Sequence, residues 1–242
     1  MTGHTSSCVF EKDPLLGGNR CCIDTIGILR AQKDTIMEKA TNVEEYIAMQ
    51  RAALSSNPEC GVTHYNLGVA LLGQGKYDEA EGSFQDALEN SPSLAEAYVQ
   101  LGGICLKRGD LEGCLQYNQM AVKSRAGFSE GYGNIGFVQL QLGDIDEAIW
   151  ALEKAIRWNP NFLQAYTTLA NAYIMKGQLE ESIETSLKVI ELEPSFAVAY
   201  NNLAIAYMEK GEFDSAIENV DKALSLGYDV AQQIQEELKA YR

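Results

Sequence analysis

The sequence is poor in the residues that most active sites and membrane anchors require. Its 242 residues include only two histidines, and no run of 18 apolar residues occurs. Histidine is the most frequent general acid or base near neutral pH, so few candidates for such catalysis exist. The missing apolar run excludes a transmembrane helix, because about 20 apolar residues are needed to cross a bilayer. We therefore expect no catalytic residue and no membrane insertion.

The sequence also lacks the features of an exported protein. Its first residues, MTGHTSSCVFEKDPLLGG, contain no basic start followed by an apolar stretch, which is typical of a secretory signal. The six cysteines follow no regular spacing, which fits a reducing compartment better than a disulfide framework. We expect a cytoplasmic location.

Half of the cysteines lie close to the N-terminus. Cys8, Cys21 and Cys22 accompany His4 there, and such ligands could hold zinc or take part in redox chemistry. The usual Cys-x-x-Cys spacing is absent, and adjacent cysteines chelate one metal poorly. The leading expectation is therefore no metal and no cofactor. A redox- or metal-dependent accessory protein using this N-terminal tail remains an alternative.

Basic residues are scarce relative to acidic ones. The chain has 19 Lys and Arg against 34 Asp and Glu, a formal net charge of −15, and residues 61–242 hold 13 of the former and 26 of the latter. Nucleic acid and anionic membranes would be repelled, so neither is expected as a partner. The acidic residues either form solvated outer faces or steer a basic partner.

What the sequence does contain is an internal repeat with a period of 34 residues. A turn glycine recurs at Gly75, Gly109, Gly143, Gly177 and Gly211. An aromatic position holds His64, Tyr98, Tyr132, Tyr166 and Tyr200. Between these markers, apolar residues follow the spacing of two amphipathic helices per copy.

Each recurring position has a physical reason. A hairpin of two short helices cannot bury its apolar face alone, so neighbouring copies must stack. The turn glycines permit the positive φ at which the first helix stops. Small residues let paired helices approach closely; they are Gly68, Gly102, Gly136, Ala170 and Ala204. Pro92, Pro160 and Pro194 end second helices, whereas the second copy has Ala126 instead of proline.

These positions resemble the tetratricopeptide repeat (TPR) family, over residues 61–228. The resemblance implies an all-α fold, a right-handed superhelical solenoid of antiparallel helix pairs. It further implies that the first helix of each copy lines a concave groove and that the scaffold recognises proteins. A fold of this kind names no partner.

The period divides the chain into four parts. An irregular N-terminal tail (1–26) precedes a degenerate hairpin (27–60), with helices expected near 28–39 and 43–56 and Asn42 as a helix cap. Five repeats follow, at 61–94, 95–128, 129–162, 163–196 and 197–228. Residues 229–242 are expected to form a C-terminal capping helix that begins at Asp229 and buries Val230, Ile234 and Leu238.

The candidate partner-binding surface follows from the implied groove orientation. In each copy, a carboxamide or hydroxyl side chain lies one residue before a recurring apolar position, and further apolar side chains lie nearby. The recurring apolar position holds Leu67, Leu101, Ile135, Leu169 and Leu203. A ladder of carboxamides could pair with the backbone of an extended peptide. The proposed groove residues are Tyr65, Asn66, Val69, Val99, Gln100, Gly103, Leu106, Gly133, Asn134, Phe137, Thr168, Asn171, Asn201, Asn202 and Ile205.

The strongest binding is predicted where the second and third repeats meet. Gly131 and Gly133 each cost a helix about 0.5–1 kcal/mol relative to alanine, without an evident packing reason in the sequence. The implied groove orientation places Gly133 on the concave side. We expect bare backbone there to open a pocket, with Phe137 on its rim.

The predicted function is a non-enzymatic scaffold or assembly factor that binds a protein or an extended peptide segment. Self-association is possible, with the degenerate N-terminal hairpin docking into the groove of a second copy. That self-assembling scaffold is a further alternative to the leading prediction.

Overall fold

A computed structural model describes residues 42–242, which form twelve α-helices and one short 3₁₀ helix with no strand among them. The helices are α2 (Val43–Ser56), α3 (Gly61–Gly73), α4 (Tyr77–Asn90), α5 (Ala95–Lys107), α6 (Leu111–Ser124), α7 (Ser129–Leu142), α8 (Ile145–Trp158), α9 (Leu163–Lys176), α10 (Leu179–Leu192), α11 (Ala197–Lys210), α12 (Phe213–Ser225), α13 (Gln232–Leu238) and η1 (Lys239–Tyr241). The all-α fold is thus confirmed. The tail at 1–26 and the helix expected at 28–39 lie outside the described residues.

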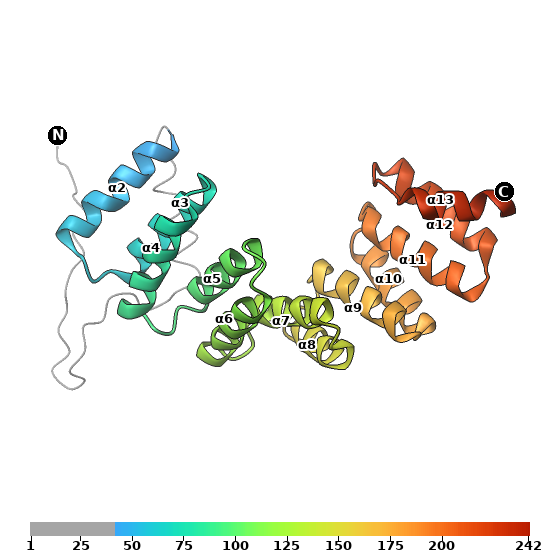
Figure 1. Ribbon diagram of the computed structural model, residues 1–242, viewed down its shortest axis with the longest axis horizontal. Helices are drawn as coiled ribbons and strands as arrows, with labels where there is room; N and C mark the ends of the chain where they lie inside the picture. Colours follow the sequence, from blue (N-terminus) through green and yellow to red (C-terminus); the bar gives the residue numbers. More distant parts are fainter. Residues whose placement is uncertain (1–41) are drawn as a thin grey trace. The chain divides into compact units, whose positions relative to one another are not determined.

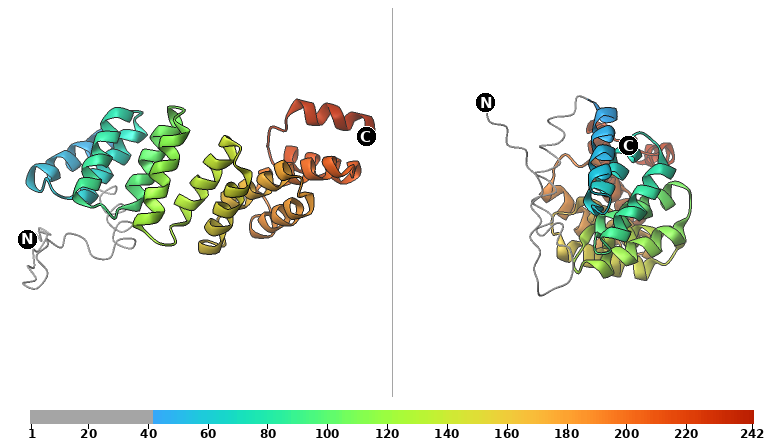
Figure 2. Two further views of the ribbon diagram at one scale, coloured as in Figure 1. Left: turned by 60° about the horizontal axis from the view of Figure 1, so that its bottom comes forward. Right: turned by 90° about the vertical axis from the view of Figure 1, so that its left-hand side faces the viewer.

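The described chain divides into two compact units, with the boundary between Ser91 and Pro92. The first unit contains α2, α3 and α4, and the second contains α5 to α13 and η1 (Figure 1). In the second unit each helix packs on the next (Figure 2). Successive first helices also pack together, α5 on α7, α7 on α9 and α9 on α11. This arrangement is a stack of antiparallel helix pairs, as predicted for a solenoid. The right-handed superhelix of the whole array stays a prediction.

The hairpin turns have the geometry that their glycines predict. The turn glycines have φ values between 74° and 88°, in the left-handed region that other residues rarely adopt. At Gly177, for example, the amide donates to the carbonyl of Ile174 and closes the last turn of α9. The predicted cap at Asn42 is also present, because its side chain accepts a hydrogen bond of 2.8 Å from the amide of Glu45.

The small positions within the hairpins are filled by the facing second helix. A Cβ atom added at Gly136 would lie 2.4 Å from Cγ of Leu152, and one at Gly68 would lie 2.7 Å from the Phe84 ring. At Gly136 and Gly68, only glycine therefore permits the two helices of the hairpin to approach so closely. The sequence prediction for this position is confirmed.

The second repeat, which lacks the proline, ends in a left-handed glycine instead. Gly127 follows Ala126 with φ +76°, and the ring of Trp158 lies against it, 2.9 Å from where a Cβ would be. The chain therefore turns at this junction by means of a left-handed glycine covered by an aromatic ring.

The C-terminal helix covers the last hairpin, although it begins later than predicted. Val230 and Leu238 are fully buried against α11 and α12, and Ile234 packs beside them. Asp229 is not its cap, because the residue before α13 is Ala231 and no side chain caps the helix. The chain from Leu226 to Ala231 instead closes α12 and crosses to α13, with Gly227 at φ +82°.

Candidate functional site

The first helices of the second unit carry an exposed apolar patch, which we call the first-helix patch and define as Gly103, Leu106 and Phe137. Leu106 on α5 and Phe137 on α7 are each 38% exposed. An added Cβ at Gly103 would meet no atom of the described residues outside its own helix backbone within 4 Å. Because 34 residues separate Gly103 from Phe137, they occupy equivalent positions on helices that pack side by side. A bare stretch of backbone therefore lies next to a protruding ring.

The pocket predicted at Gly133 is not present. An added Cβ there would lie 2.8 Å from the ring of Phe162, and Gly133 is buried beneath that ring. Gly131 is likewise explained by packing, because its Cβ would lie 2.8 Å from Val122. The sequence shows that both are glycines but not that side chains from neighbouring segments cover them. The open backbone lies at Gly103 instead.

Part of the predicted carboxamide ladder is engaged within the protein. The Asn134 amide donates to the Asn118 side chain at 3.0 Å, and the Asn202 amide donates to the Thr167 carbonyl at 3.0 Å. Thr168 donates to the Gln164 carbonyl of its own helix at 2.8 Å. Asn202 is only 7% exposed, and its neighbour Asn201 is also buried. The Asn202 bond joins the first helices α9 and α11, and the Asn134 bond joins α7 to the second helix α6. An uninterrupted ladder of free carboxamides therefore does not exist.

Asn118 is a residue that the sequence reasoning missed. It lies fully buried on α6, where the equivalent positions hold Phe84, Leu152, Ser186 and Val220. Its amide also donates to the Cys114 carbonyl at 2.8 Å. The signal was available, since a carboxamide in a core position of the repeat requires a polar partner. Asn118 anchors Asn134 rather than leaving it free for a ligand.

Three of the predicted groove residues lie in the first unit, on α3. Tyr65, Asn66 and Val69 are all half-buried on α3, and the Tyr65 ring lies 5.7 Å from that of Phe84. His64 Nε2 lies 2.8 Å from the Pro58 carbonyl, so this side chain helps to close the linker before α3. His64, in the aromatic position of the first repeat, thus contacts the preceding linker.

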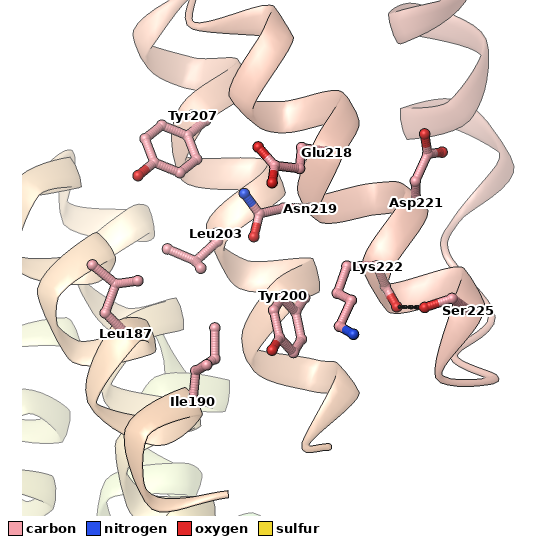
Figure 3. A pocket seen from close by; sticks show the side chains of 10 residues that line it. All are labelled: Leu187, Ile190, Tyr200, Leu203, Tyr207, Glu218, Asn219, Asp221, Lys222 and Ser225. Atoms are coloured by element: carbon pink, nitrogen blue, oxygen red, sulfur yellow. Dashed lines mark hydrogen bonds between the residues drawn. The ribbon is translucent and has the colours of Figure 1, made fainter. Parts of the chain in front are cut away.

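A hollow lies on another surface of the second unit, between the second helices α10 and α12. We call it the furrow. It has a volume of about 620 Å³, and α11 forms its floor (Figure 3). The side chains that line it are Leu187, Ile190, Tyr200, Leu203, Tyr207, Glu218, Asn219, Asp221, Lys222 and Ser225. Leu187 and Ile190 face the α11 side chains across it in Figure 3. Sequence reasoning directed at the first helices did not find this surface.

A second hollow continues from the furrow along α10. It has a volume of about 420 Å³ and is lined by Tyr166, Glu184, Thr185, Leu187, Lys188 and Glu191. Leu187 borders both hollows and is 49% exposed, so it forms a ridge between them. The two hollows follow the repeat, because Tyr166 and Tyr200 are 34 residues apart.

Tyr173 on α9 and the Cys114 thiol on α6 have strongly raised pKa values. Burial and the neighbouring Glu153, to which the hydroxyl donates at 3.2 Å, raise the pKa of Tyr173 to about 12. Burial and the nearby Cys105 raise the pKa of the Cys114 thiol to about 11. A thiol with such a pKa is a poor nucleophile at neutral pH. We therefore assign both side chains a role in packing.

Within residues 42–242, no three His, Cys, Asp or Glu side chains are grouped so that they could hold a metal ion. The alternative site at His4, Cys8, Cys21 and Cys22 lies outside the described residues. None of the described helices is long and apolar enough to cross a bilayer.

The stacked helix pairs define the chain as a helical repeat protein, and sequence comparison identifies the repeat. Models described as tetratricopeptide repeat match residues 48–95, 65–127, 139–185 and 197–229, and a TPR repeat model matches residues 170–211. The chain belongs to the tetratricopeptide repeat family. No curated protein sequence matches it.

Several solved structures are similar to this chain. A structure of MamA is 27% identical, with 73% of this chain and 98% of that chain covered and a TM-score of 0.60. YrrB, described as a TPR protein with an unusual peptide-binding site, is 21% identical over 79% of this chain and 97% of its own, with a TM-score of 0.65. PilF of Pseudomonas aeruginosa is 17% identical over 89% and 96%, with a TM-score of 0.73. The last two show a shared fold alone.

Proposed function

We propose that this protein is a non-enzymatic scaffold or assembly factor that binds a protein or an extended peptide segment through its first helices. One observation carries the proposal: the first-helix patch exposes two large apolar side chains beside bare backbone. Exposed apolar side chains that lie together mark binding surfaces more often than isolated ones do. Membership of the TPR family supports the same function.

In the patch, a partner can pack against the Phe137 ring and approach the backbone at Gly103. The Phe137 ring is large and has few rotatable bonds, so its burial stabilises a complex at a modest entropic cost. At Gly103 the missing side chain lets a partner group approach the helix backbone. We place the centre of binding here, on α5 and α7, instead of at Gly133.

Other first-helix side chains extend this surface. We propose that the partner continues over Val99, Gln100, Asn134, Thr168, Asn171 and Ile205. Beneath it Asn202 joins α11 to α9, and Asn201 is buried beside Asn202. Asn171 is exposed, and Val99, Gln100 and Ile205 are half-buried. Tyr65, Asn66 and Val69 form a separate candidate surface on the first unit.

Site-specific photo-crosslinking tests the proposal. A benzophenone amino acid replaces Phe137 in the full chain, and the protein is irradiated in native lysate. The matched control replaces Met120, which is similarly exposed but lies on the second helix α6. We expect discrete crosslinked proteins from position 137 and none from position 120. Equal adducts from the two positions, or none from position 137, would refute the proposal.

A further inference from the structure

The furrow is independent of the first-helix patch. It receives Leu203 and Tyr207 from α11, whereas the first-helix surface receives Ile205. Residues two apart in an α-helix point about 200° apart, so these side chains lie on opposite sides of α11. Anything bound in the furrow therefore leaves the first-helix surface free.

The furrow differs from the equivalent place one repeat earlier. There the Tyr173 hydroxyl donates a hydrogen bond of 3.2 Å to the Glu153 carboxylate. The residues 34 positions later are Tyr207 and Leu187. Leucine cannot accept that hydrogen bond, and the Tyr207 hydroxyl has no hydrogen-bond partner among residues 42–242. The furrow thus combines an exposed leucine with an unsatisfied hydroxyl.

The charges around the furrow are unequally neutralised. The Asp221 carboxylate is bound by the guanidinium of Arg242, and Lys222 Nζ lies 5.9 Å from the centroid of the Tyr200 ring. Glu218 is exposed and makes no ion pair with any residue of the described chain. In Figure 3, Glu218 lies on the same side of the furrow as Tyr207 and Leu203. A free carboxylate therefore stands beside an apolar floor.

We propose that the furrow binds a partner protein through a segment in which an arginine side chain is adjacent to an aliphatic one. The guanidinium pairs with Glu218 while its methylene stem lies along Tyr207. The aliphatic side chain covers Leu187, which is 49% exposed. Arginine fits better than lysine, because its planar group both stacks on an aromatic ring and binds a carboxylate with two N–H groups.

The same helix already holds an arginine in this way. Both terminal nitrogens of Arg242 donate to the carboxylate oxygens of Asp221 on α12. Glu218 lies one turn earlier on α12. The net charge of −15 favours approach of a basic segment.

The shape of the hollow favours a chain segment as the occupant. The furrow and its neighbour, about 620 and 420 Å³, meet at the Leu187 ridge and together run across two repeats. Side chains that project from one face of a helix or extended peptide can enter successive hollows of this kind. Glu184, in the second hollow, repeats the position of Glu218 and offers a second carboxylate.

Selection from a peptide library tests the proposal. A displayed library of random peptides of about 12 residues is selected on the purified full chain and counter-selected on the Leu187→Asp variant. Synthetic copies of the enriched peptides are then titrated by calorimetry. We expect sequences with arginine beside an aliphatic residue, and at least tenfold weaker binding to Leu187→Asp and to Glu218→Arg. Circular dichroism checks that both variants remain folded.

Two controls make the result specific. Glu209→Arg changes the charge equally at an exposed position outside the furrow, and it should alter the affinity less than twofold. A peptide in which glutamate replaces the arginine should regain affinity for Glu218→Arg. The proposal is overturned if no peptide is enriched, if the enriched peptides lack arginine, or if Glu209→Arg weakens binding as much as Glu218→Arg. Loss of binding in Phe137→Ala instead would assign the peptides to the first-helix patch.

Discussion

Glycines in equivalent-looking helical positions have opposite roles in this protein. At Gly136 the facing Leu152 occupies the space that a side chain would need, whereas at Gly103 the space is open. The sequence distinguishes them only through the repeat, because Gly136 falls in the small position and Gly103 does not. The consequences for stability should therefore differ in sign.

We predict that Gly103→Ala stabilises the protein by about 0.5–1 kcal/mol, since alanine is the better helix former and its methyl group meets nothing. We predict that Gly136→Ala destabilises it by about 1–3 kcal/mol, because the methyl group would lie 2.4 Å from Leu152 Cγ. Urea denaturation of the two variants measures both changes. Changes of the same sign would contradict the assignment of these two sites.

Cysteine reactivity offers a second test at this scale. Cys114 is 2% exposed, and the pKa of its thiol is raised to about 11 by burial and by Cys105. A raised thiol pKa leaves less thiolate at pH 8, so we predict that Cys114 is alkylated at least about tenfold more slowly than half-buried Cys60. Peptide mass spectrometry after timed iodoacetamide treatment gives both rates. Raising the pH toward 11 should accelerate the reaction at Cys114, and equal rates at pH 8 would show that this site opens readily.

At the scale of the helices, the stability of the array depends on the seams between hairpins. Leu169 on α9 is buried in a cluster formed with α8 and the end of α7. We predict that Leu169→Ala costs about 2–4 kcal/mol and loosens the adjacent hairpins together. Leu187→Ala makes the same chemical change at a half-exposed position and should cost less than about 1 kcal/mol. Coincident denaturation midpoints for Leu169→Ala and the parent would contradict the seam assignment.

The helix pairs could be predicted because each depends on local rules that the 34-residue period repeats. Glycine at the turns, small residues in the hairpins and Asn42 at a helix start all have the predicted geometry. Gly133 could not be predicted in this way, since the ring that covers it comes from Phe162, 29 residues later. The same limit applies to Asn134 and Asn202, whose partners lie on neighbouring helices. Periodicity gives positions along a helix, whereas contacts between copies depend on which side chains differ from copy to copy.

The furrow also depends on a difference between copies of the repeat. The replacement of Glu153 by Leu187 at the equivalent position is visible in the sequence, and it removes the partner of the following tyrosine. Its meaning becomes clear only when α10 and α12 are seen to face each other across α11 (Figure 3). Comparing copies of the repeat for loss of a polar pair would have found it.

At the scale of the whole molecule, two compact units carry separate candidate surfaces. The second unit contains both the first-helix patch, on α5 and α7, and the furrow, on α10, α11 and α12. The two proposals thus place two partners on separate surfaces of this unit. Its net charge of −15 is of the sign that the proposed arginine-containing partner requires.

The central claim is that the first-helix patch on α5 and α7 binds the partner. Its most direct test is the affinity of the protein captured by crosslinking at position 137, titrated against the parent, Phe137→Ala and Met120→Ala. We predict that Phe137→Ala weakens binding at least about tenfold, because removal of a buried aromatic anchor costs more than 1.4 kcal/mol. Met120→Ala should leave the affinity within about twofold of the parent. Equal affinities of Phe137→Ala and the parent, with the variant folded, would contradict the claim.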